Sequence, residues 1–328
     1  MEPTTKSDAA TPPPRVWRWG VWYDGDRSWH VTLAGRNARL LPLLMLDADR
    51  PVEVSIPHII HQIWLGPRAI PANCHEWMQT WITLHPTWEY RLWRDEDVKT
   101  FVLRNQKAFD VAGNYGEKSD ILRYEILERY GGVYADVDVA CLKSFESLLE
   151  VSVSTYACFT YSHVCSFFAI SDAQLFTFVA GMANTGNVEV SNSVLLSVPH
   201  HPLLQRLIDT ISRDSQQARL DASAMALIAH MSGDTTLLAS LSTKPRSAMD
   251  TIARTGPGLL TKTFMAAVGW TDGASRAEGF LSPGSERDGA IALPVEFFSP
   301  LPNTLRHSSI ATFPQETMAV HYWARTWL

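Results

Sequence analysis

The sequence has little cysteine. Four cysteines occur among 328 residues, and no two of them have the CxxC spacing. Zinc knuckles need such closely spaced pairs of ligands, and small secreted domains that depend on disulfides are much richer in cysteine. The sequence therefore indicates neither a zinc knuckle nor a disulfide framework, and we expect all four thiols to be buried: Cys74, Cys141, Cys158 and Cys165.

The chain also lacks an excess of positive charge. Its 28 lysines and arginines are outnumbered by 34 aspartates and glutamates, the net charge is −6, and the basic residues form no cluster. Proteins that bind nucleic acid or an anionic membrane surface usually present a basic patch. We therefore expect no nucleic-acid partner and no electrostatic attraction to a membrane.

No hydrophobic run is long enough to cross a bilayer. The stretch Leu40–Leu46 is far shorter than the roughly 20 residues that a membrane-spanning helix needs. Residues 1–14 are polar and rich in proline, without the apolar centre of a signal peptide. The sequence therefore predicts a soluble, cytoplasmic protein with no transmembrane segment in this chain. A location in the Golgi lumen is the alternative if the chain is the trimmed part of a longer, anchored protein.

The length and composition suit one large domain or one domain with an appendage, because 46% of the residues are hydrophobic and 19% are charged. Val16–Leu33 alternates aromatic and polar residues around Asp24 and Gly25, which is typical of a β-hairpin. We interpret its tryptophans as packing residues rather than as an acceptor-binding platform. The expected organisation is a disordered tail over 1–14, a hairpin extension over 15–55 and the main domain over 56–328.

The most informative stretch is Lys118–Ser147. Ser119 can cap a helix, apolar residues follow it at helical spacing, and Gly131–Gly132 supplies a stop signal. The next residues, Val133–Val139, alternate as a β-strand does. This stretch therefore predicts a helix that is followed directly by a short strand.

Asp136 and Asp138 lie two residues apart in that strand, so we expect them to point to the same side, together with Tyr134. Neighbouring carboxylates repel each other unless a cation lies between them, and Mg2+ or Mn2+ is the usual partner of oxygen ligands. The pair indicates a metal site, although the same Asp-x-Asp pattern also occurs in solvated turns. Ala140 and Cys141 exclude an EF-hand loop. Ala140 and the mid-chain position also disfavour a phosphohydrolase of the haloacid dehalogenase type.

Strands and helices are expected to alternate before these aspartates. This order favours an α/β domain with a central, mostly parallel sheet flanked by helices, whose ligands lie outside the carboxyl ends of the strands. Trp64 lies at the end of the first strand and so falls at the same edge as the aspartates. The expected elements are strand Ile56–Leu65, helix Cys74–Leu84, strand Thr87–Trp93, a helix from Asp95 to Gln106 and the helix that begins at Ser119.

The second half of the chain continues the alternation. A polar, glycine-rich stretch, Thr271–Asp288, is either a lid over a ligand or a surface loop. We interpret His200 and His201 as structural, because adjacent residues beside prolines point apart. The expected elements are strands over Tyr156–Ile170, helix Gln174–Ala183, strand Glu189–Val198, helices within 203–231, a helix opened by Thr255–Gly258 whose amino end could bind an anion, and a late strand and loop over Ala292–Asn303.

Four blocks of the sequence resemble, in order, the signature blocks of family 32 glycosyltransferases, which carry a DxD sugar-binding motif: Ile56–Pro67, Ser119–Asp138, Arg254–Thr261 and Ala319–Leu328. Relatives there are α-mannosyltransferases, mannosyl inositol phosphorylceramide synthases, α-1,4-galactosyltransferases and the clostridial glucosylating toxins. The resemblance implies a GT-A fold. It also implies Mn2+ or Mg2+ as cofactor and transfer of a hexose, with retention, from a nucleotide-sugar donor to a hydroxyl of a glycan, glycolipid or protein.

The resemblance implies roles for the nucleotide and metal ligands. The tryptophan that stacks on the nucleotide base corresponds to Trp64. Asp138, Asp136 and His321 would bind the metal, and Asp136 would also hold the ribose. The sequence departs from the family at Tyr322, which replaces a more common second histidine.

Further roles concern the sugar and the phosphates. The resemblance implies that Asp120, Arg123 and Asn192 hold the transferred sugar. Thr326 and Trp327 match a terminal Ser-Trp that contacts the donor phosphate, with threonine in place of serine.

The donor stays open at this point. GDP-mannose is our first choice, because the sequence blocks resemble those of the mannosyltransferases most. The alternatives are the UDP-hexoses UDP-galactose, UDP-glucose and UDP-N-acetylglucosamine. A DxD-type phosphohydrolase or a non-catalytic nucleotide-sugar-binding module is the alternative function.

Overall fold

The computed structural model describes residues 16–18, 21–23, 55–149, 177–185, 189–232, 248–267, 290–293, 295–305 and 312–324. Several sequence predictions fall outside this set. They concern the tail over 1–14, the strands over Tyr156–Ile170, the glycine-rich loop Thr271–Asp288, and the residues Cys158, Cys165, Thr326 and Trp327.

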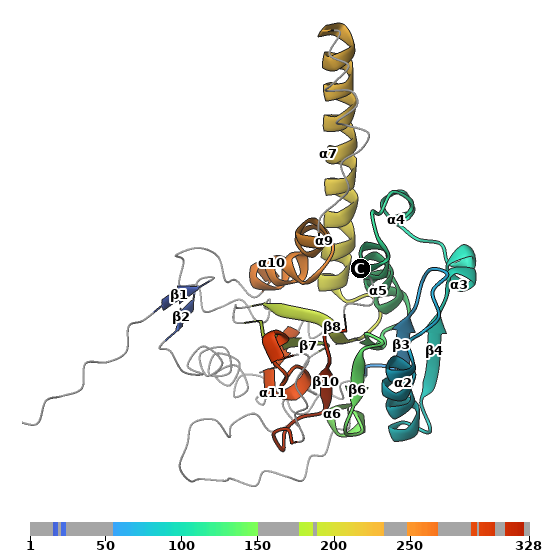
Figure 1. Ribbon diagram of the computed structural model, residues 1–328, viewed down its shortest axis with the longest axis vertical. Coiled ribbons are helices and arrows are strands. Elements are labelled where there is room, and N and C mark those ends of the chain that lie inside the picture. The colour runs from blue at the N-terminus through green and yellow to red at the C-terminus, as the bar shows by residue number, and fades with distance from the viewer. Residues whose placement is uncertain are drawn as a thin grey trace, which may run out of the picture.

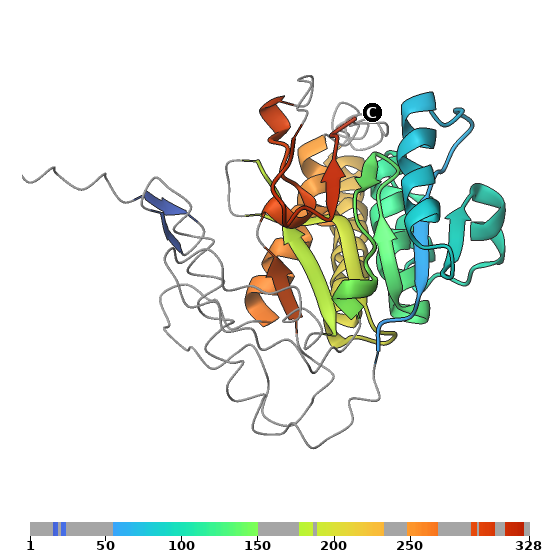
Figure 2. The same ribbon diagram turned by 90° about the horizontal axis from the view of Figure 1, so that it is seen from below.

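A six-stranded sheet forms the centre of the main domain, in the order β4-β3-β5-β8-β7-β9. Five strands run in the same direction, and β8 alone runs antiparallel to its neighbours β5 and β7. Figure 2 shows these strands side by side. The predicted mostly parallel sheet is confirmed. Its strands are β3 Ile59–Ile63, β4 Glu89–Trp93, β5 Gly132–Ala135, β7 Phe178–Met182, β8 Val190–Ser197 and β9 Ala290–Leu293.

Helices cover both faces of this sheet (Figure 1). On one face α5, α7 and α10 pack together, and on the other face α2 packs against a small two-stranded sheet made of β6 and β10. The bounds of the helices are α2 Ala72–Leu84, α3 Asp95–Thr100, α4 Gln106–Asp110, α5 Tyr115–Tyr130, α6 Glu146–Leu149, α7 Pro202–Ser232, α9 Ala248–Arg254, α10 Pro257–Ala267 and α11 Val295–Phe298, with the 3-10 helix η2 at Asn303–Leu305.

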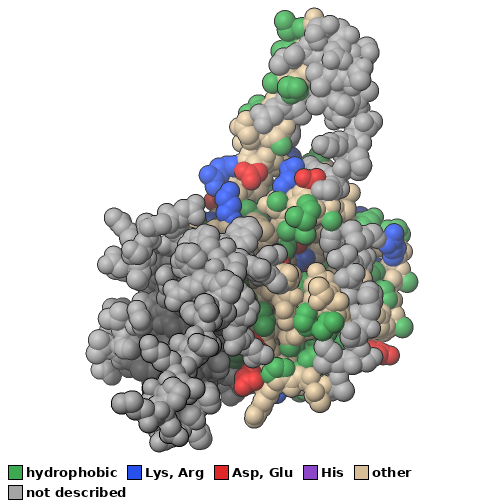
Figure 3. All heavy atoms as spheres, turned by 60° about the vertical axis from the view of Figure 1, so that its left-hand side comes forward, with side chains coloured by type: hydrophobic (Ala, Val, Ile, Leu, Met, Phe, Trp, Pro, Cys, Tyr) green, Lys and Arg blue, Asp and Glu red, His purple; other side chains and the backbone are tan. Residues whose placement is uncertain are grey.

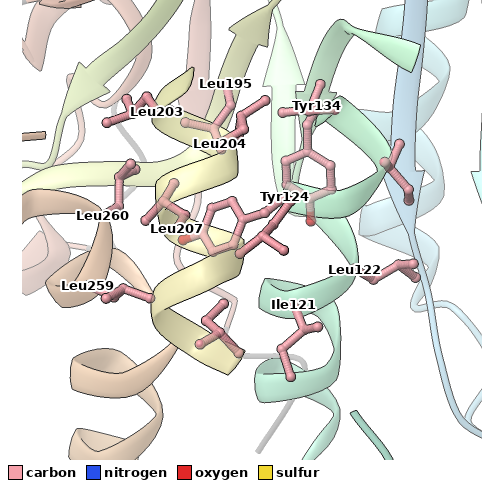
Figure 4. Close-up of a cluster of buried hydrophobic side chains, with 14 of the residues drawn as sticks. Ile121, Leu122, Tyr124, Tyr134, Leu195, Leu203, Leu204, Leu207, Leu259 and Leu260 are labelled. Atoms are coloured by element: carbon pink, nitrogen blue, oxygen red, sulfur yellow. The ribbon is translucent and has the colours of Figure 1, made fainter. Parts of the chain in front are cut away.

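The period of two in β5 divides the core between the two faces. Val133 and Ala135 pack with Trp81 of α2, whereas Tyr134 packs with the helices of the other face. Figure 4 shows this second cluster, in which leucines of α7 and α10 lie opposite Tyr124 of α5. The alternation predicted for this strand is therefore confirmed as far as Ala135.

Helix α5 begins earlier than the sequence predicts. Its cap is Asn114, whose side-chain oxygen accepts a hydrogen bond from the N–H of Glu117 at 2.8 Å. Ser119 therefore lies inside the helix rather than at its end. The sequence did not reveal this, because asparagine is as good an N-cap as serine. The predicted stop is confirmed: Gly131 and Gly132 have φ values of 64° and 93°, which glycine adopts readily.

The strand that should carry both aspartates is shorter than predicted. β5 ends at Ala135, and the N–H of Val139 donates to the carbonyl of Asp136 at 3.1 Å, which closes a turn. The chain then pairs with β10 (Ala319–His321) as β6 (Val139–Cys141). The prediction of one continuous strand was wrong because β-branched residues continue through the turn, whereas the pairing with β8 ends at Ala135.

Three further boundaries differ from the sequence predictions. Residues 178–182 form β7 rather than a helix, because a short apolar run buried on both sides suits a strand equally well. The helix expected from Asp95 to Gln106 ends at Thr100, and Phe101 has extended backbone. The late strand ends at Leu293 and gives way to α11.

The helices expected within 203–231 form a single helix, α7, of 31 residues. Its first turns pack against α5 and α10, and its remainder projects from the body of the molecule in Figures 1 and 3. Within the described part of the chain, no helix combines the length and the apolar character needed to cross a membrane.

The N-terminal extension contains a short antiparallel ladder. β1 (Val16–Arg18) pairs with β2 (Val21–Tyr23), so the connection lies at residues 19–20. A hairpin is therefore present, but its connection precedes Asp24 and Gly25, where the sequence predicted it.

Candidate active site

Asp136 and Asp138 occupy the turn at the carboxyl end of β5, beside the parallel strand β3. The pairing of β10 with β6 places His321 opposite Val139 and so next to Asp138. This turn therefore joins side chains from the middle and the end of the chain.

These three residues form a cluster of possible metal ligands. Asp136, Asp138 and His321 each offer one ligand atom, and the three atoms lie within 4.8 Å of one another. His321 Nε2 is 3.4 Å from Asp138 Oδ1. The buried Nδ1 of His321 has no hydrogen-bond partner among the described residues. Two carboxylates and an imidazole suit Mn2+ or Mg2+, so the residues fit the metal that the sequence predicted.

The C-terminal segment holds Asp138 in place. The N–H of Ala324 donates to Asp138 Oδ2 at 2.8 Å, and the N–H of Tyr322 donates to the Asp138 carbonyl at 2.9 Å. Burial favours the neutral acid, but His321 and the hydrogen bonds to the carboxylate lower the pKa of Asp138 below its usual range. Burial likewise opposes the charged imidazole, but Asp138 raises the pKa of His321. The turn thus keeps Asp138 ionised.

Arg123 lies between two carboxylates. Its Nη1 is 3.1 Å from Asp136 Oδ1, and its Nη2 is 3.0 Å from Asp120 Oδ1. The guanidinium also donates to the Asn192 carbonyl at 2.7 Å and lies over the ring of Tyr134, 4.5 Å from its centroid. Because only 4% of Arg123 is exposed, these contacts replace water around a buried charge.

Asp120 is the centre of a second group of contacts. Its Oδ1 accepts from Asn192 Nδ2 at 2.9 Å, and its Oδ2 accepts from the Thr255 hydroxyl at 3.1 Å. Burial raises the pKa of Asp120 to about 6, although Arg123 opposes this shift. The structure therefore brings Asp120, Arg123 and Asn192 together, and the sugar-holding role that the resemblance implied for them stays a prediction.

Tyr134 and Thr255 belong to this network but were not predicted as site residues. The Tyr134 hydroxyl donates to Asp136 Oδ1 at 2.6 Å. The sequence did contain a signal for Tyr134, because the alternation of the strand places Tyr134 on the same side as Asp136. Thr255 belongs to a block that carries the family resemblance, where it was considered only as part of a possible anion site. Instead, its hydroxyl donates to Asp120, which ties the start of α10 to α5.

The predicted base-stacking residue, Trp64, follows β3 and lies at the same edge of the sheet. It packs with Cys74, Met78 and Val137, and Val137 is the residue between the two aspartates. Its indole N–H donates to the Arg68 carbonyl at 2.7 Å, and 7% of the residue is exposed. Protein atoms therefore cover most of the Trp64 ring.

The two adjacent histidines are apart from this cluster. His201 is buried, and its Nδ1 accepts from the N–H of Leu203 at the start of α7. His200 faces Glu128, with Nδ1 3.1 Å from Oε1. These contacts agree with the structural role expected for both.

The arrangement can bind a cation and a polar ligand next to each other. The carboxylates and imidazole of the turn supply metal ligands, and the buried network around Arg123 supplies fixed donors and acceptors on the Asp136 side. Such preorganised charges are suited to holding a phosphate ester through a bound cation.

Comparisons with known proteins agree with the motif. Residues 71–154 match the family described as "Glycosyltransferase sugar-binding region containing DXD motif". Inositol phosphoceramide mannosyltransferase 2 of Schizosaccharomyces pombe is 32% identical over 182 residues, which cover 54% of this chain and 45% of that protein. A mannosyl phosphorylinositol ceramide synthase of Saccharomyces cerevisiae is 32% identical over 171 residues, which cover 51% and 37%. The chain thus spans less than half the length of these relatives.

Solved structures give a weaker likeness. The catalytic domain of alpha-toxin from Clostridium novyi aligns with a TM-score of 0.42 and 11% sequence identity, over 73% of this chain and 83% of that one. The glycosyltransferase PaToxG aligns with a TM-score of 0.39 and 13% identity, over 75% and 82%.

Proposed function

We propose that this chain, which contains the DXD-motif sugar-binding region of glycosyltransferases, is a metal-dependent hexosyltransferase with a GT-A fold. The observation that carries the proposal is the cluster of Asp136, Asp138 and His321 beside the buried Arg123 network. In this arrangement three possible metal ligands adjoin a buried polar network at the carboxyl edge of a mostly parallel sheet, where ligands of α/β domains bind.

Asp138, Asp136 and His321 would hold Mn2+ or Mg2+. When bound, this ion stabilises the negative charge that develops on a departing diphosphate. Asp138 would be the principal ligand, because its carboxylate does not pair with Arg123 or Tyr134, as that of Asp136 does. Asp136 is shared with Arg123 and Tyr134, and it would also hold the ribose.

Asp120, Arg123 and Asn192 would orient the sugar. Their side chains are already fixed by one another, so they lose little rotamer freedom when a ligand binds. Arg123 would also counter negative charge near the phosphates. Thr326 and Trp327 are proposed phosphate contacts on the basis of the family resemblance, which also supports retention of configuration.

GDP-mannose is the proposed donor. Two of the relatives are named as a mannosyltransferase and a mannosyl phosphorylinositol ceramide synthase, and these names support mannose over the other hexoses. They also favour a glycolipid hydroxyl as acceptor over a glycan or protein. The match to the sugar-binding family does not favour the phosphohydrolase alternative.

A donor panel tests this proposal. The protein is incubated with Mn2+ or with EDTA and with GDP-mannose, UDP-galactose, UDP-glucose or UDP-N-acetylglucosamine, and released nucleotide is measured. We expect slow, Mn2+-dependent release of GDP from GDP-mannose without acceptor and faster release with an inositol phosphoceramide. Donor binding without any release would indicate a binding module, and a trapped phosphoaspartate would indicate a phosphohydrolase.

A further inference from the structure

The hairpin formed by β7 and β8 closes at the same edge of the sheet as the turn that follows β5. Because β8 is antiparallel to both β5 and β7, the end of β7 and the start of β8 lie at this carboxyl edge. The pairing extends one residue beyond the strands, since the N–H of Ala183 donates to the Glu189 carbonyl at 2.8 Å. Glu189 therefore lies at the ligand-binding edge, three residues before Asn192, the residue of β8 that contacts Asp120.

The carboxylate of Glu189 has no partner. Burial raises the pKa of four acidic side chains in the described part of the chain: Asp120, Glu125, Asp136 and Glu189. The first three are held by ion pairs or by backbone N–H groups. Glu189 is half-buried, and no described residue forms a hydrogen bond or an ion pair with its carboxylate. Withdrawing an unpartnered carboxylate from water costs stability, and such groups are concentrated at functional sites.

A second polar group of this hairpin also lacks a partner. Thr185 lies three residues beyond the end of β7, and its buried hydroxyl oxygen has no hydrogen-bond partner among the described residues. Thr185 and Glu189 flank positions 186–188, one on each arm of the hairpin. A hydroxyl can donate and accept, and a carboxylate can accept several hydrogen bonds, so the two groups together suit a ligand that carries several hydroxyls.

The end of the hairpin is connected to the proposed metal site. Asn184 Nδ2 donates to the Pro300 carbonyl at 3.2 Å, and the carbonyl of the next residue, Leu301, accepts from Trp323 Nε1 at 2.9 Å. The ring centroid of Trp323 lies 4.1 Å from that of His321. A continuous chain of contacts therefore joins the hairpin to a proposed metal ligand.

We propose that Glu189 and Thr185 bind the acceptor, and that the acceptor is a cyclic polyol whose neighbouring hydroxyls donate to the Glu189 carboxylate. The inference rests on the proposed function, because it assumes that a sugar held beside Asn192 is transferred. A carboxylate accepts from two adjacent ring hydroxyls at once, whereas a serine or threonine of a protein acceptor offers only one. The inositol ring of an inositol phosphoceramide offers such adjacent hydroxyls.

Steady-state kinetics with inositol phosphoceramide in detergent micelles, Mn2+ and the donor that the panel selects, GDP-mannose by expectation, test the inference. The variants are Glu189→Gln, Thr185→Val and, as a control, Glu96→Gln, whose carboxylate is exposed on α3. We expect Glu189→Gln to raise the KM for inositol phosphoceramide roughly 10- to 150-fold, the range for one hydrogen bond to a charged group. Thr185→Val should raise it roughly 2- to 12-fold, and Glu96→Gln should match the wild type.

Two further readouts distinguish acceptor binding from a structural role. Nucleotide release without acceptor should stay within about twofold of the wild type in all three variants, because a loss of acceptor binding alone leaves the donor reaction intact. The melting temperature of Glu189→Gln should be unchanged or higher, because the substitution removes an uncompensated charge.

The outcomes separate the inference from the proposed function. If Glu189→Gln keeps the wild-type KM for inositol phosphoceramide, or loses nucleotide release and transfer equally, the acceptor role is wrong while the proposed function stands. A wild type that transfers the sugar to a serine-containing peptide but not to inositol phosphoceramide also overturns the inference alone. If the wild type releases no nucleotide from any donor of the panel, the proposed function and the inference both fail.

Discussion

Arg123 and Asp136 are joined across the carboxyl edge of the sheet by a buried ion pair, with Nη1 3.1 Å from Oδ1. The same guanidinium pairs with Asp120 through Nη2. The Arg123 guanidinium therefore lies between two carboxylates and reduces their mutual repulsion. It also links the proposed sugar site to the proposed metal site.

Replacing Arg123 by alanine should reduce both stability and activity. Removal of one partner from a buried pair leaves the others uncompensated, which costs about 3–5 kcal/mol. Urea unfolding of Arg123→Ala measures this loss. Arg104→Ala is the matched control, because Arg104 pairs with Asp209 at the surface and the loss should be at most about 1 kcal/mol. Equal losses in the two variants would contradict the account.

His61 should make the protein less stable in mild acid. Its ring is fully buried, Nε2 lies 3.0 Å from the Gly131 carbonyl, and Nδ1 accepts from Trp93 Nε1 at 3.2 Å, so the neutral form is satisfied. Burial lowers the pKa of His61 to about 4. Because the unfolded chain then binds more protons, this contribution is fully present above pH 6.5 and is lost as the pH falls towards 4, by roughly 3 kcal/mol.

Chemical denaturation at a series of pH values measures this effect. In His61→Gln the part of the slope between pH 6.5 and 4 that comes from His61 should disappear, whatever the overall stability of the variant. An unchanged slope would show that His61 is not the titrating group.

Thr255→Val should weaken the proposed sugar site. The substitution removes the hydroxyl that donates to Asp120 Oδ2 at 3.1 Å, and a hydrogen bond to a carboxylate contributes about 1.5–3 kcal/mol. We expect a lower kcat with GDP-mannose and unchanged binding of Mn2+. Thr263→Val in the adjoining helix α10 is the control, because its hydroxyl donates to the Leu259 carbonyl of the same helix. Equal activity in the two variants would remove Thr255 from the site.

Gly132→Ala should prevent the close approach of β5 and β3. Gly132 has a φ of 93°, and a Cβ atom there would lie 2.5 Å from the carbonyl oxygen of Ile59. Thermal unfolding should show a loss of more than about 2 kcal/mol. Gly113→Ala is the comparison, because Gly113 lacks a positive φ, and a similar loss there would argue against backbone strain as the cause.

The parts of the fold that depend on local chemistry could be predicted from the sequence. Gly131 and Gly132 marked the end of α5, and the apolar alternation marked β5. The start of α5 and the end of β5 could not be located, because several residues suit a cap and because valines continue past the last paired residue. The break after Thr100 depends on Glu125, whose carboxylate accepts the N–H groups of Arg104 and Asn105. Such long-range hydrogen bonds leave no local pattern.

In the candidate site, too, local sequence patterns predicted some residues, whereas others depend on long-range contacts. The spacing of Asp136 and Asp138 indicated a metal site, and the helix spacing of Asp120 and Arg123 indicated a shared face. His321 meets Asp138 only because β10 pairs with β6, and only the family resemblance pointed to it. The contact of Thr255 with Asp120 depends on the packing of α10 against β8 and of α9 against α10, which no local pattern reports.

The central claim is that Asp138 holds a cation which assists nucleotide release. Its most direct test is the rate of Mn2+-dependent GDP release from GDP-mannose by the wild type, by Asp138→Asn and by the surface control Asp209→Asn. We predict that Asp138→Asn is slower by about 100-fold or more with a similar melting temperature, while Asp209→Asn matches the wild type. A folded Asp138→Asn protein with wild-type turnover would contradict the account.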